Sequence, residues 1–177
     1  MMNKKMFSMV VYVMIAIGGC SATAPCANEF GRSGFESLSL GVCLIGMNEA
    51  ETLYTERVLK LMGGDYDDLT IEFLTSAGVT EQYNTKYSVD ISCVAGYITT
   101  EQDLYCVPLA LPHELAHRDI QERTEGMQVG ETHTLASGWR NEDTERIRWL
   151  KGATIDSLPR NEGAKCESES AGLTRKK

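Results

Sequence analysis

The chain has 177 residues, of which 42% are hydrophobic, and it carries a formal net charge of -8. One domain with a short tail fits this length, and the hydrophobic fraction is ordinary for a globular core. We expect no nucleic-acid partner, because such proteins gather lysine and arginine to neutralise phosphates, and here acidic residues outnumber basic ones by 25 to 17.

The first twenty residues have the pattern of an export signal. Lys4 and Lys5 precede an apolar run over residues 6–17, which is followed by Gly18-Gly19-Cys20. A charged start, a short apolar stretch and small residues at the cleavage point are typical of a signal peptide, and the run is short for a membrane-spanning helix. We therefore predict that residues 1–19 are removed and take no part in the fold.

The segment Ile17-Gly18-Gly19-Cys20 also resembles the lipobox of bacterial lipoproteins. That resemblance implies cleavage before Cys20, a lipid attached to this cysteine, and anchoring in the cell envelope, at the outer membrane if the host is Gram-negative. The alternative is ordinary secretion, with cleavage nearby after Ala22 or Ala24.

Composition and hydrophobic periodicity divide the rest of the chain. Residues 20–45 are rich in serine, glycine and alanine and predict a tether, residues 46–158 predict a folded domain, and residues 159–177 predict a polar tail. Within the domain the apolar spacing predicts, in chain order, a helix over 48–62, a strand over 69–74, strands over 91–98 and 104–107, a helix over 109–122 and a helix over 141–151. The pattern over 75–90 is ambiguous, and its polar part fits a loop or a frayed helix.

Cysteines in an exported chain are read first as a disulfide framework. Cys93 and Cys106 are symmetric about the midpoint of the predicted hairpin, so a simple antiparallel register would place them opposite each other at a distance that suits a disulfide. We therefore predict a Cys93–Cys106 bridge. The sequence leaves the second bridge open between two of the three cysteines Cys26, Cys43 and Cys166.

The segment His113-Glu114-Leu115-Ala116-His117 carries two of the chain's three histidines. Positions four apart project from the same face of a helix, so His113 and His117 can bind one metal ion. Zn²⁺ suits this arrangement, because catalytic zinc sites use three protein ligands and keep a fourth position for water. Glu114 is then the general base that accepts a proton from the zinc-activated water.

The longer segment Leu111-Pro112-His113-Glu114-Leu115-Ala116-His117 resembles the LPHExxH helix of zincin metallopeptidases, and the predicted hairpin before it resembles the one beside that helix. Trp139-Arg140-Asn141-Glu142 is similar to the WLNE segment of gluzincins, whose glutamate is the third zinc ligand. The resemblance therefore implies Glu142 as third ligand, with Glu145 as runner-up and two weaker candidates, His133 and Glu122. Two departures are a spacer about five residues longer and Arg146 in the place of an aspartate.

This resemblance implies an α+β fold: a small zincin-like domain with a mixed sheet, a β-hairpin beside the HExxH helix and a second, C-terminal helix. It also implies a zinc metallopeptidase that hydrolyses peptide bonds of a peptide or protein substrate. The alternative is a disulfide-stapled envelope lipoprotein that binds a partner or has a structural role and does not turn over.

Overall fold

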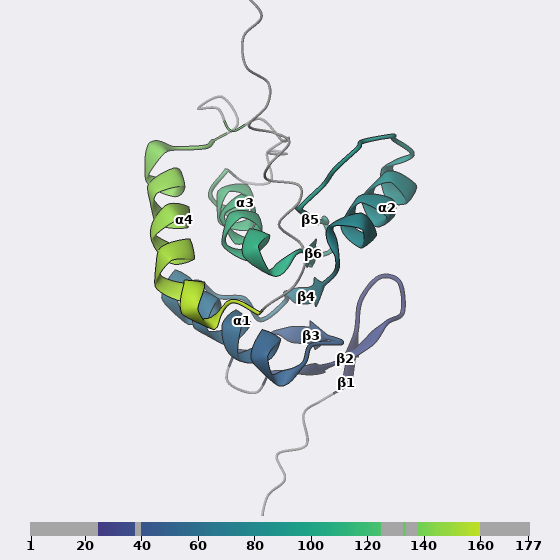
Figure 1. Ribbon diagram of the computed structural model, residues 1–177, viewed down its shortest axis with the longest axis horizontal. Helices are drawn as coiled ribbons and strands as arrows, with labels where there is room; N and C mark the ends of the chain where they lie inside the picture. The colour runs from purple at the N-terminus through teal and green to yellow at the C-terminus, as the bar shows by residue number, and fades with distance from the viewer. Residues whose placement is uncertain (1–24, 38–39, 125–132, 134–137, 160–177) are drawn as a thin grey trace, which may run out of the picture.

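Six short strands form one mixed sheet in the computed structural model, which describes residues 25–37, 40–124, 133 and 138–159 (Figure 1). In spatial order they are β1 (Pro25–Ala27), β2 (Ser33–Glu36), β3 (Cys43–Ile45), β4 (Thr70–Phe73), β6 (Asp103–Cys106) and β5 (Gly96–Ile98). The pairs β3–β4 and β4–β6 are parallel, whereas β1–β2, β2–β3 and β5–β6 are antiparallel. With its four helices, the domain confirms the predicted α+β class and mixed sheet.

The first three strands correct the prediction that residues 20–45 form a tether. Residues 25–45 build half of the strands of the sheet, and β3 lies inside it between β2 and β4. Composition misled here because strands of three or four residues show little alternation, although Leu44 is fully buried. A disulfide from Cys26 to Cys43, with a Cα–Cα distance of 6.0 Å, fastens β1 to β3 and settles a pairing that the sequence left open.

Local signals set the bounds of the first two helices. In α1 (Glu49–Met62) the Asn48 side chain accepts from the backbone N–H of Glu51, whose carboxylate accepts from the Asn48 backbone, and Gly63 closes the helix in the left-handed conformation. The ambiguous stretch becomes α2 (Ser76–Tyr87), with Thr75 as its N-cap. Only Val79 of α2 is buried, which explains why its periodicity is weak.

The predicted hairpin is present as β5 and β6, but its register makes the Cys93–Cys106 bridge wrong. Gly96, three residues beyond Cys93, is the residue opposite Cys106. Cys106 is a free, fully buried thiol, whereas Cys93 is disulfide-bonded. The prediction placed the centre of the hairpin between residues 99 and 100, whereas the strand pairing is centred on residue 101.

The remaining predicted helices are α3 (Leu111–Arg123), with Pro112 in its first turn, and α4 (Asn141–Thr154). α1, α3 and α4 pack against one another, and α3 also contacts β5 (Figure 1). Arg146 of α4 donates to the backbone carbonyl of Met62 and pairs with Asp119 of α3 at 3.1 Å. One arginine therefore joins all three helices.

The core lies between the sheet and these helices. Leu44, Ile71 and Leu104 are neighbours across β3, β4 and β6, are fully buried, and share a cluster with Tyr54 of α1 and Leu115 of α3. Each such side chain contributes about 1.5–3 kcal/mol to stability. This cluster fixes α3, and with it the histidine motif, against the sheet.

Three predictions concern residues outside those described: the signal peptide over 1–19, the lipid site at Cys20 and the polar tail beyond residue 159. Among the helices that are described, none has the length and hydropathy needed to cross a membrane.

Opening the Cys26–Cys43 bridge is expected to lower the free energy of unfolding by about 3 kcal/mol, because the unfolded chain regains the freedom of a closed loop of this size. The two cysteines are 17 residues apart. Urea-induced unfolding of Cys26→Ala, Cys43→Ala and the double variant measures this. Either single substitution opens the bridge, so all three should lose about the same stability; a double variant that loses twice as much as each single would contradict the assignment.

Candidate metal centre

Helix α3 brings His113 and His117 together on one face. Their Nε2 atoms lie 3.1 Å apart and their ring centroids 4.8 Å apart. The helix is fixed by Leu111 and Leu115, which are fully buried in the main core, and positions 113 and 117 lie on its other side, where Ile120 packs in a second cluster with Trp139. The spacing expected from the sequence is therefore present in the structure.

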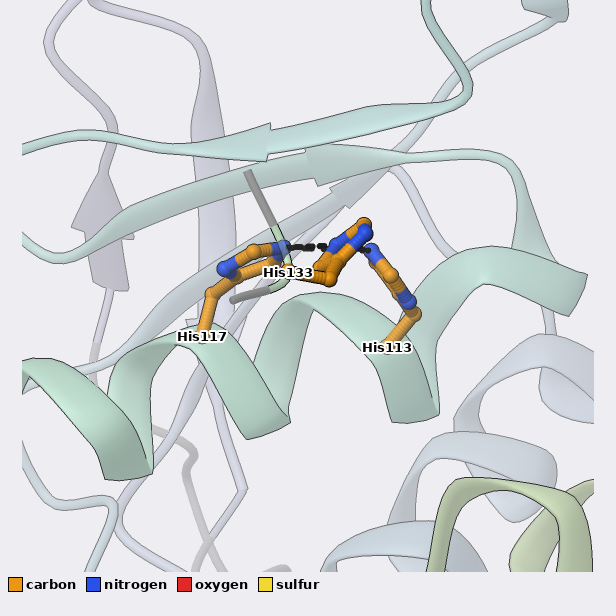
Figure 2. A group of neighbouring side chains, drawn as sticks. All are labelled: His113, His117 and His133. Carbon is orange, nitrogen blue, oxygen red and sulfur yellow. Dashed lines mark hydrogen bonds between the residues drawn. The ribbon is translucent and has the colours of Figure 1, made fainter. Parts of the chain in front are cut away.

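The third histidine of the chain completes the group. The Nε2 atom of His133 lies 3.1 Å from that of His113 and 3.2 Å from that of His117 (Figure 2). Each of the three residues offers a ring nitrogen to the same point, and within the described part of the chain this is the group of side chains suited to a metal ion.

Hydrogen bonds alone cannot satisfy this arrangement. A ring nitrogen is either protonated, and then only a donor, or unprotonated, and then only an acceptor. Among three nitrogens two must be in the same state, so at least one of the three close contacts is repulsive. A cation between them removes the conflict, because all three unprotonated nitrogens can then direct their lone pairs at it.

The electrostatics of the site keep the imidazoles in the form that binds a metal. Burial, together with the neighbouring histidines, lowers the pKa of His113 to about 3 and the pKa of His117 to about 4. Both rings are therefore neutral at pH 7, and their lone pairs are available without the loss of a proton.

The spacing of the three nitrogens fits zinc. Zinc–nitrogen bonds of about 2.0–2.1 Å in a tetrahedral site place ligand nitrogens about 3.3–3.4 Å apart. The observed separations of 3.1–3.2 Å need only a small adjustment. Three protein ligands leave a fourth position for water or substrate, which is the ligand number of catalytic zinc sites.

Glu142, the predicted third ligand, does not join this group, nor do Glu145 or Glu122. Glu142 and Glu145 are exposed on α4, and Glu122 pairs with Arg118 at 2.8 Å. Trp139 donates from its Nε1 to Thr144 of α4, and its ring contacts all three histidines. His133, weighed only as a weak candidate, is the residue that the fold brings to the pair.

The sequence held one signal for His133. It is the only other histidine in the chain, and it lies 16 residues after His117. Its surroundings show no helical or alternating pattern that would predict where the segment returns to α3. Histidine scarcity alone could have ranked it above the glutamates, which are common in this acidic chain.

Glu114 lies against the β5–β6 hairpin. It is 5% exposed, and a Cβ atom added at Gly96 would come within 2.6 Å of its Cγ and 2.8 Å of its Cδ. The same added atom would be 2.8 Å from the Cβ of Cys106. The absence of a side chain at Gly96 is therefore what lets the glutamate pack beside the strand, one residue along the chain from His113.

Comparison of the chain with known protein families, curated proteins and solved structures found no match. The resemblance to zincins is therefore limited to the LPHExxH segment and the neighbouring hairpin. The geometry of the three histidines does not depend on that resemblance.

Zinc binding should depend on His133 and be independent of Glu142. We expect about one zinc ion per purified chain. In His133→Ala the affinity for zinc should fall by more than about 100-fold, which exceeds the loss seen when a residue that only hydrogen-bonds to a metal ligand is removed. Glu142→Ala should bind as the unmodified chain does. Elemental analysis and chelator competition measure both, and zinc that is lost with Glu142 but retained without His133 would reverse the ligand assignment.

Proposed function

We propose that the protein is a zinc-dependent hydrolase that cleaves peptide bonds. The observation that carries this proposal is the convergence of three Nε2 atoms within 3.1–3.2 Å of one another. The buried Glu114 is the next residue after His113 on the same helix. A ligand set of three side chains with an adjacent carboxylate is the minimum that zinc-assisted hydrolysis needs.

The residues divide the chemistry between them. His113, His117 and His133 hold the ion as neutral ligands. When bound, zinc polarises a carbonyl group and makes water acidic enough to supply a nucleophile near neutral pH. The carboxylate of Glu114 accepts the proton of the attacking water at one of its oxygens and returns it to the nitrogen of the leaving amine. Its burial excludes bulk water from this transfer.

An extended peptide is the substrate that the surroundings favour. β5 is one of the two terminal strands of the sheet, and it packs against α3 and Glu114. A strand at the end of a sheet presents unpaired backbone groups that an extended peptide can bind by adding a strand. This supports a peptide or a flexible segment of a protein as substrate.

The proposed location is the cell envelope, with the chain anchored through a lipid on Cys20. The Cys26–Cys43 disulfide supports an oxidising compartment. The same features fit the second candidate, a binding or structural envelope lipoprotein without turnover. The two candidates differ in the role of Glu114: the enzyme needs its carboxylate as a general base, whereas a protein that only binds metal does not use it.

Glu114→Gln is expected to keep the zinc and lose the activity. Glutamine has the shape of glutamate but cannot accept the proton, so the rate should fall by about 10²–10⁴-fold. A peptide library read by mass spectrometry detects cleavage, and elemental analysis of the same samples reports the metal. If the unmodified zinc-loaded chain cleaves no peptide, or the variant cleaves as fast, the hydrolase proposal fails and the non-catalytic candidate replaces it.

Gly96→Ala should slow peptide cleavage by moving Glu114 without changing zinc binding. The added Cβ would clash with the glutamate, and a displacement of about 1 Å at a catalytic group costs on the order of 10²-fold in rate. We expect zinc to be retained. Gly152→Ala is the matched control, because its Cβ would meet no atom within 4 Å. Unchanged cleavage by Gly96→Ala would show that the glutamate does not depend on this contact.

A further inference from the structure

We propose that Trp139 is a positioning residue of the three-histidine site: its indole ring holds the imidazoles in register for the ion and so raises the affinity for zinc. This inference rests on the proposed function, since it assumes that the three histidines bind zinc. It concerns a residue that is itself no ligand, and it can fail while the metal site stands.

The contacts single out this side chain. The Trp139 ring centroid lies 4.3 Å from that of His133, 5.1 Å from that of His117 and 5.4 Å from that of His113. Two of the histidines come from α3, and the third lies outside this helix, 16 residues after His117. One buried ring, only 7% exposed, therefore bridges ligands that the backbone does not join.

The indole is also held in place by a hydrogen bond to α4. Its Nε1–H donates to the Thr144 hydroxyl at 2.9 Å, which fixes the ring to the first turn of α4. A ring with both a packed face and an engaged N–H has one orientation rather than several. The histidines thus pack against a ring that does not have to rearrange when the zinc ion binds.

The backbone before Trp139 is fastened to the end of α3. Gly138 has a positive φ of 82°, and an added Cβ would come within 2.7 Å of the Thr124 side chain. Arg123 donates to the Gly138 carbonyl at 2.9 Å and pairs with Asp143 at 2.9 Å. The helix that carries His113 and His117 therefore also determines where the tryptophan lies.

Pre-organisation is the physical gain from this arrangement. Three imidazoles held close together without a metal repel one another in at least one pair, so the free site tends to open, and His133 is the ligand outside the helix. A fixed aromatic surface limits that opening and reduces the ordering that binding would otherwise require. The effect should appear mainly in metal affinity and in the geometry of the bound ion.

The first test measures affinity in the full chain, by competition between the protein and a chromophoric chelator for Zn²⁺. We expect Trp139→Leu to bind about 10-fold or more weakly, as observed when groups that orient metal ligands are removed, and Trp139→Phe to recover most of the loss. Trp149→Phe is the matched control, since Trp149 is the other tryptophan of the chain, lies on α4 and is 56% exposed. Equal affinity in all four proteins would overturn the proposal while leaving the zinc site intact; no zinc in the unmodified chain would instead remove the proposed function.

A spectroscopic test guards against a variant that merely unfolds. Co²⁺ quenches a nearby indole, so its addition should quench Trp149→Phe, in which Trp139 is the only tryptophan, far more than Trp139→Phe. The visible Co²⁺ absorption should keep its tetrahedral form in Trp139→Phe and lose intensity in Trp139→Leu at equal helix content by circular dichroism. Equal quenching of the two single-tryptophan proteins, or an unchanged Co²⁺ spectrum in folded Trp139→Leu, would contradict the role.

Discussion

Three imidazole nitrogens within 3.1–3.2 Å of one another form a contact that the protein cannot satisfy by hydrogen bonding alone. The surrounding structure must therefore hold them together, and a cation bound between them would relieve the conflict. Much of the fold contributes to holding the three imidazoles together. α3 is buried against the sheet along one side, and its other side presents two of the three imidazoles.

The support for this contact comes from elements that are distant in sequence. β5 closes against Glu114, with Gly96 leaving the room that the carboxylate needs. On another side Trp139 covers the imidazoles, and Arg123 and Arg146 tie α4 to α3. The Cys26–Cys43 bridge secures the far end of the sheet, outside the site. Most elements of this small domain therefore contribute to the packing around the three histidines.

Several features followed from local rules and agreed with the structure. The capping box at Asn48 and the glycine after Met62 set the bounds of α1, and alternation predicted β4. Other features did not follow. The strands of residues 25–45 are too short for a periodic signal, and a difference of three residues in register separated Cys93 from Cys106. Short strands and turn centres are decided by pairing with the rest of the sheet rather than by their own sequence.

The sequence by itself determined the pair of histidines and the adjacent glutamate, because the helix repeat alone places positions 113 and 117 on one face. It could not determine the third member of the site. His133 follows a segment whose sequence shows no periodicity, so no local pattern predicts that it lies beside the pair. Glu142 is exposed on α4 and does not belong to the group, whereas Trp139 contacts all three imidazoles. Spacing along a helix is a local property of the backbone, whereas convergence of ligands from separate elements is decided only when the core has packed.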